Sequence, residues 1–107
     1  MEAVLVYVTA AGEEEARRIG RLLVERRLAA CVNVIPKIFS AYRWKGELVE
    51  DQEAVLLVKT TRATVDRVIQ AVKEVHSYEV PAILVLEVAA GYEPFLDWVA
   101  AEVRGCE

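Results

Sequence analysis

Residues 29–60 read AACVNVIPKIFSAYRWKGELVEDQEAVLLVKT, and this stretch decides the fold. Its first arm, Cys31 to Trp44, is rich in β-branched and aromatic residues and shows no helical periodicity. Lys45 and Gly46 then supply the flexible backbone that a tight reversal needs, and the second arm, Leu48 to Thr60, returns antiparallel. We therefore predict one long β-hairpin, against which the rest of the chain packs.

The hairpin is long for a chain of this size. A continuous strand over residues 31–44 would span roughly 45 Å at about 3.3 Å per residue, whereas a compact chain of this length has a radius of gyration of about 13 Å. We expect the tip to overhang the domain and to expose Phe39, Tyr42 and Trp44, and exposed aromatic side chains usually have a partner. Pro36 lacks a backbone donor and should lie at an edge, a bend or a bulge. The alternative is that the arm breaks at Pro36 into two short strands.

The composition restricts the class of protein. With 107 residues the chain has room for one domain, residues 1–107, and its hydrophobic fraction of 55% is high for that size. The excess is most simply buried in a subunit interface. A net charge of −4 disfavours nucleic acid as a partner. The longest apolar run, Ala3 to Val8, is too short to cross a membrane, and no basic-then-apolar leader opens the chain.

The cysteine content points to the cytoplasm. Cys31 and Cys106 are too few and too separate for a disulfide framework or a closed tetrahedral zinc site, so we expect a soluble protein in a reducing cytoplasm. Arg and Glu dominate the charged residues and Asn and Gln are rare, which is compatible with a heat-adapted, thermostable protein.

The remaining segments predict two helices that cover one face of a sheet. Ala3 to Thr9 is an apolar strand, and a helix follows Gly12 and ends near Arg27. A second helix has Thr61 as its N-cap, and a strand over Ile83 to Ala89 and a last helix from Pro94 complete the chain. The order strand, helix, strand, strand, helix, strand predicts an α+β, split βαβ sandwich with an added C-terminal helix. The core-facing residues of the first two helices are predicted to be Ala16, Ile19, Gly20, Leu23, Val65, Val68, Ile69, Val72 and Val75.

Enzyme motifs are mostly absent from the sequence. There is a single His, and there is no glycine-rich phosphate loop, nucleophile elbow, HExxH or CxxC. The loop after the first strand, residues 9–13, has neither the arginine cradle of an acylphosphatase nor the CxxC of a copper chaperone. We therefore predict a protein that is not an enzyme.

The connector after the second helix holds the best candidates for a binding site. His76, Tyr78 and Glu79 are predicted to project into a cleft and to contact a cation or a small ligand. Alternatively, His76 caps the helix or bonds a nearby carbonyl group. Cys31 is either a ligand or a small buried hydrophobic residue. Lys59 either pairs with a carboxylate, holds an anion, or simply ends an exposed strand.

Several segments together resemble the CutA divalent-cation tolerance family, and they cover nearly the whole chain in order. They are Leu28 to Asn33, Ser40 to Gly46, Glu53 to Thr60, His76 to Pro81 and Phe95 to Trp98. The resemblance implies a ferredoxin-like subunit in a tight homotrimer, with hairpins pairing between subunits. It also implies a role in tolerance of copper and other divalent metals, without an established enzymatic activity.

The resemblance also bears on the metal site. Copper-binding relatives have been proposed to use a Cys near the end of the first strand and two successive His residues after the second helix. Here Val8 and Val75 stand at the positions of that Cys and the first His. We expect only weak copper or other divalent-cation binding, unless subunit interfaces bring His76, Glu79 and Cys31 together.

Two functions are therefore expected from the sequence. The first is a cytoplasmic, non-enzymatic trimer that binds divalent cations or a small ligand in clefts between subunits, with Lys59, Tyr78 and Trp44 as ligand contacts. The second is a signalling or assembly scaffold that resembles the nitrogen-regulatory trimers and affects metal tolerance indirectly.

Overall fold

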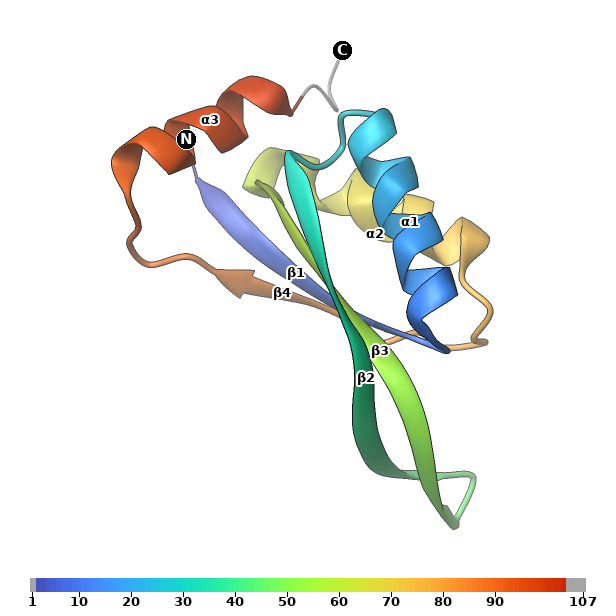
Figure 1. Ribbon diagram of the computed structural model, residues 1–107. Coiled ribbons are helices and arrows are strands. Elements are labelled where there is room, and N and C mark those ends of the chain that lie inside the picture. The colour runs from blue at the N-terminus through green and yellow to red at the C-terminus, as the bar shows by residue number, and fades with distance from the viewer. Residues whose placement is uncertain (1, 104–107) are drawn as a thin grey trace.

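The computed structural model describes residues 2–103. Within them a four-stranded sheet has the order β2-β3-β1-β4, and every neighbouring pair is antiparallel. This α+β arrangement of strands and helices is the one predicted from the sequence (Figure 1). The elements are β1 (Ala3–Ala10), α1 (Glu13–Glu25), β2 (Cys31–Trp44), β3 (Glu47–Thr61), the 3₁₀ turn η1 (Arg62–Thr64), α2 (Val65–Val75), β4 (Ile83–Glu87) and α3 (Glu93–Glu102).

The long hairpin is confirmed. Lys45 and Gly46 form its two-residue turn with φ values of 50° and 83°, as a type I′ turn requires. The ladder shifts register between Ile35 and Ile38, so Pro36 lies at an irregularity in edge strand β2, as predicted. The alternative of two separate short strands is wrong, because β2 is one strand. The hairpin projects well beyond the helices in Figure 1, and the molecule is 44 Å long.

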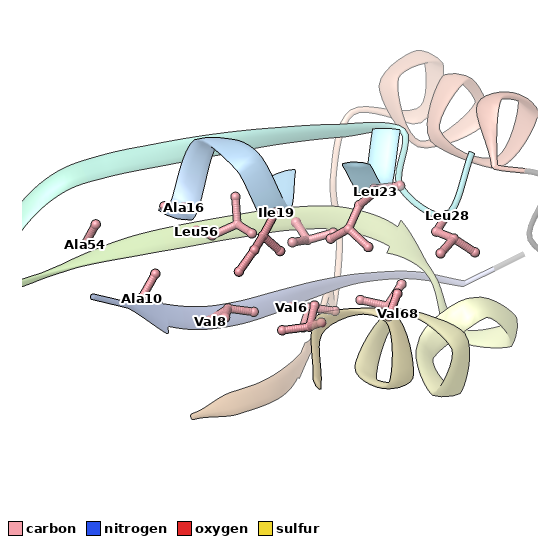
Figure 2. Close-up of a cluster of buried hydrophobic side chains, with 14 of the residues drawn as sticks. Val6, Val8, Ala10, Ala16, Ile19, Leu23, Leu28, Ala54, Leu56 and Val68 are labelled. Atoms are coloured by element: carbon pink, nitrogen blue, oxygen red, sulfur yellow. The ribbon is translucent and has the colours of Figure 1, made fainter. Parts of the chain in front are cut away.

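The core lies between the sheet and helices α1 and α2. Alternate residues of β1 are buried beneath the helices. All four residues of α1 that were predicted to face the core are buried against the sheet. Each fully buried Val, Leu or Ile side chain contributes roughly 1.5–3 kcal/mol. Figure 2 shows part of this cluster, in which Leu56 of β3 and Val6 of β1 gather with Ile19 and Leu23 of α1 and with Val68 of α2.

Three element boundaries differ from the predictions. Helix α1 ends at Glu25 because the N–H groups of Leu28 and Ala29 return to the Leu23 carbonyl oxygen. Strand β4 ends at Glu87, which pairs with Val4. Its partner β1 begins only one residue earlier, at Ala3, so little of β1 remains for β4 to pair with. Thr61 precedes η1 and makes no side-chain cap, since its hydroxyl oxygen lies 2.7 Å from that of Thr64.

The second face of the sheet is left partly open. Leu84 and Leu86 of β4 pair with Tyr7 and Leu5, the β1 residues that alternate with the core-facing ones. They are 59% and 47% exposed even though α3 packs Val99 against the rest of the fold. Over residues 2–103, no helix has the length and apolar character needed to cross a membrane.

Candidate functional site: a groove beside the hairpin

A concave feature lies where the overhanging hairpin meets the connector between α2 and β4. It has a volume of about 710 Å³, and we call it the hairpin groove. Segments distant in the sequence meet here: the end of β1, the distal half of β2, the middle of β3 and the connector. The groove is lined by Thr9, Phe39, Ser40, Ala41, Tyr42, Trp44, Glu53, Tyr78, Glu79, Val80 and Ala82.

The lining combines aromatic rings with negative charge. Phe39, Tyr42 and Trp44 come from β2, and Tyr78 comes from the connector. Glu53 and Glu79 supply two carboxylates, and the lining residues include no Lys or Arg. The groove therefore suits an apolar or cationic ligand better than an anionic one.

Glu53 and Tyr78 join the hairpin to the connector. The Tyr78 hydroxyl donates a hydrogen bond of 2.6 Å to Glu53 Oε2, and the Glu53 side chain is only 6% exposed. Burial and this carboxylate raise the pKa of Tyr78 above its ordinary value of 10.0. Tyr78 consequently stays a neutral hydrogen-bond donor at physiological pH.

Glu15 fixes the connector from the other side. Its carboxylate accepts hydrogen bonds from the Ala11 N–H (2.9 Å), the Ser77 N–H (2.8 Å) and the Ser77 hydroxyl (3.1 Å). Burial alone would raise the pKa of Glu15, but these hydrogen bonds lower it below the ordinary value of 4.5. The start of α1 and the connector are thus held together by an ionised carboxylate.

Both ring nitrogens of His76 are engaged within the subunit. The Tyr78 N–H donates to Nδ1 at 3.0 Å, so Nε2 carries the proton and donates to the Thr9 carbonyl oxygen at 2.7 Å. The two rings also pack at a centroid distance of 4.7 Å. This geometry matches the alternative in which His76 bonds a nearby carbonyl group, and a metal ion would have to displace one of these hydrogen bonds.

The structure brings only part of the predicted site together. Trp44, Tyr78 and Glu79 line the groove. Cys31 and Lys59 lie opposite each other at the other end of the hairpin, where Lys59 Nζ donates to the side-chain oxygen of Asn33.

The predicted metal ligands do not form a metal centre in one subunit. In the part of the chain that the structure describes, no three His, Cys, Asp or Glu side chains are grouped so that they could hold a metal ion. Cys106 lies outside the described residues. The ligand set His76, Glu79 and Cys31 therefore does not fit a metal ion unless a second subunit contributes.

Sequence reasoning missed Glu53, Thr9 and Glu15 as parts of this region. Glu53 carried a signal, because it is the last charged residue before the apolar run Ala54 to Val58, and a carboxylate at such a position needs a partner. Thr9 acts through its backbone carbonyl group, which carries no signal in the sequence. Phe39 and Tyr42 were predicted as exposed aromatic residues but not as parts of a binding site.

The model of the CutA1 divalent ion tolerance protein family matches residues 4–102. The chain belongs to this family. It is 52% identical to the divalent-cation tolerance protein CutA of Thermus thermophilus, over 89% of this chain and 92% of that protein. It is 45% identical to mouse protein CutA over 87% of this chain, but it spans only 52% of the mouse protein's length.

Solved structures of CutA proteins have the same fold. The Thermus thermophilus divalent cation tolerance protein superposes with a TM-score of 0.92 and 47% identity, over 95% of this chain and 99% of that one. CutA1 of Oryza sativa superposes with a TM-score of 0.94 and 34% identity, over 97% and 95% of the two chains. Relatives are named for different compartments, chloroplastic in Arabidopsis thaliana and periplasmic in Archaeoglobus fulgidus.

Proposed function

We propose that this CutA-family protein serves divalent-cation tolerance as a non-enzymatic, cytoplasmic homotrimer, and that it binds a divalent cation such as copper, or a small ligand, in clefts between subunits. The hairpin groove carries the proposal, because it combines a volume suited to a ligand with aromatic and acidic side chains. The groove is bordered by the overhanging hairpin, which projects beyond the helices (Figure 1).

Association between subunits is supported by the apolar surface that one subunit leaves exposed. Phe39 and Leu48 on the hairpin are 73% and 66% exposed, and Leu84 on β4 is 59% exposed. Exposed apolar side chains on a projecting hairpin and on an edge strand are typical of protein interfaces. Static light scattering at micromolar concentration should give about three times the mass of one chain, and a monodisperse monomer would contradict the trimer.

The metal part of the proposal depends on groups from two subunits, since residues 2–103 of one subunit group too few ligands. Copper(II) should be titrated by calorimetry into the wild type, His76→Ala, and Glu14→Gln, which changes an exposed side chain of α1. Saturable binding that is lost in His76→Ala and kept in Glu14→Gln supports a metal site at the connector.

A second function is favoured by the surface of α3. Tyr92, Phe95 and Trp98 are 77%, 42% and 42% exposed at the far end of the fold from the hairpin tip (Figure 1). Such side chains suit contact with another protein, so the trimer would serve as a signalling or assembly scaffold. The copper titration separates the two functions, because a scaffold with indirect metal effects predicts no saturable copper binding.

A further inference from the structure

The hairpin groove has the size and the lining of a site for an organic molecule. A volume of about 710 Å³ falls within the range of pockets that hold small molecules. Phe39, Tyr42 and Trp44 border it from β2, and Tyr78 borders it from the connector. Aromatic rings are poor partners for a hard divalent cation, which prefers several oxygen ligands, but they pack well against an apolar body.

One carboxylate oxygen in the groove lacks a partner. Glu53 is more than nine-tenths buried, and the Tyr78 hydroxyl occupies its Oε2. Oε1 accepts no hydrogen bond from residues 2–103. Every fully buried side-chain oxygen or nitrogen in these residues has a partner, so Oε1 is not fully buried. Oε1 therefore keeps some accessible surface, and Glu53 lines the groove. A largely buried carboxylate oxygen is best satisfied by a cationic donor.

The negative charge of the lining favours a positively charged ligand. Glu79 adds a second, exposed carboxylate, and none of the lining residues is basic. The only ammonium group placed near the aromatic rings is that of Lys45, whose Nζ lies 5.8 Å from the Trp44 ring centroid in the described structure. This distance lies within the range of a cation–π interaction, so the Trp44 ring is accessible to an ammonium group.

From these observations we infer that the hairpin groove binds a small organic ammonium ion, with its apolar body among the aromatic rings and its ammonium group on Glu53 and Glu79. The inference rests on the proposed role of the groove as a ligand site and specifies the chemistry of the ligand. An ammonium group can donate to Glu53 Oε1 without disturbing the bond from Tyr78.

The test uses phenethylammonium as the probe and 2-phenylethanol as its neutral counterpart of similar shape. Both are titrated by calorimetry into the full chain, whose mass is measured by light scattering in the same buffer. Glu53→Gln and Glu79→Gln keep the side-chain size and an acceptor oxygen but remove the charge. Glu14→Gln removes a charge from the exposed face of α1 and is the matched control.

Phenethylammonium should bind saturably and 2-phenylethanol much more weakly. Glu53→Gln should weaken phenethylammonium binding about tenfold, since a hydrogen bond to a buried charge is lost. Glu79→Gln should weaken it about threefold, because an exposed charge contributes less. Glu14→Gln should bind like the wild type. If Glu53→Gln fails to fold, Glu79→Gln and the comparison of the two probes still decide the question.

Equal binding of the two probes, or unchanged binding in both groove variants, would overturn the inference. Absence of saturable phenethylammonium binding to a protein of trimer mass would also overturn it, and would indicate that a neighbouring subunit fills the groove, while the proposed assembly would stand. A monomer that binds phenethylammonium with the expected pattern would instead support the ligand chemistry and contradict the trimer.

Discussion

The carboxylate of Glu15, in the first turn of α1, accepts hydrogen bonds from both the N–H and the hydroxyl of Ser77, 62 positions later in the chain. This contact fixes the connector whose next residue, Tyr78, reaches Glu53 on the hairpin. The geometry of the groove therefore depends on a carboxylate that is not part of its lining.

Glu15→Gln should lower the free energy of unfolding at neutral pH by about 1–3 kcal/mol, because a charged acceptor of several hydrogen bonds is lost. The folded state lowers the pKa of Glu15 below 4.5. Its contribution is therefore fully present above pH 4.5 and is lost as the pH falls through the lower, folded-state pKa. Urea denaturation of both proteins from pH 7 to pH 3 should show the stability difference shrinking in this acidic range.

Glu14→Gln serves as the control for that measurement, because Glu14 is exposed one position earlier on the same helix. Its unfolding curve should follow the wild type at each pH to within about 0.5 kcal/mol. A difference between Glu15→Gln and the wild type that stays constant down to pH 3 would show that ionisation of Glu15 does not stabilise the fold.

Gly20→Ala should destabilise the protein by about 1 kcal/mol. A Cβ atom at this position of α1 would lie 2.9 Å from both Leu56 Cδ1 and Val32 Cγ2, so the two side chains would have to shift. Overpacking of this kind costs roughly 1–3 kcal/mol, which the better helix propensity of Ala offsets by about 1 kcal/mol. Urea denaturation at a fixed subunit concentration measures the change.

Gly12→Ser should instead raise the stability of the protein. Gly12 is the N-cap of α1, its backbone is extended, and a Cβ there meets no atom within 4 Å. A Ser hydroxyl can accept a hydrogen bond from the first turn and should stabilise the helix by a few tenths of a kcal/mol. If Gly20→Ala proved as stable as Gly12→Ser, the close packing of α1 on the hairpin would be looser than the distances indicate.

Tyr78→Phe should cost about 1–3 kcal/mol of stability, since it leaves Glu53 Oε2 buried without its donor. A double-mutant cycle with Glu53→Gln isolates the interaction between the two side chains. The cost of Tyr78→Phe should shrink in the Glu53→Gln background, where the acceptor is no longer charged. Additive effects of the two substitutions would show that the hydrogen bond does not couple the hairpin to the connector.

The hairpin and the core could be predicted because their signals are local and periodic. The β-branched run of Cys31 to Trp44, the turn at Lys45 and Gly46, and the spacing of Ile19 and Leu23 each determine their own structure. The sheet order then follows from the sequence of elements.

The polar contacts of the site could not be predicted in the same way. The bond from Tyr78 to Glu53 joins residues 25 positions apart, and one polar residue in a strand has no periodicity that reveals its partner. His76 is equally ambiguous, because the sequence cannot show that a backbone carbonyl and a backbone N–H occupy its two nitrogens. Its role as a metal ligand stays a prediction for the copper titration to decide.

Trp44→Glu should weaken association of the subunits. Trp44 lies at the end of β2 beside the turn and is 41% exposed, so a charge there would be buried without a partner in any interface that covers the hairpin tip. Val24→Glu introduces the same charge at an apolar residue of α1 that is 38% exposed. Light scattering over a dilution series should show Trp44→Glu dissociating at higher concentration than the wild type and Val24→Glu. Equal dissociation of the two variants would mean that the hairpin tip is not an interface. The two substituted residues have similar exposure and receive the same charge, so the variants differ only in where that charge lies.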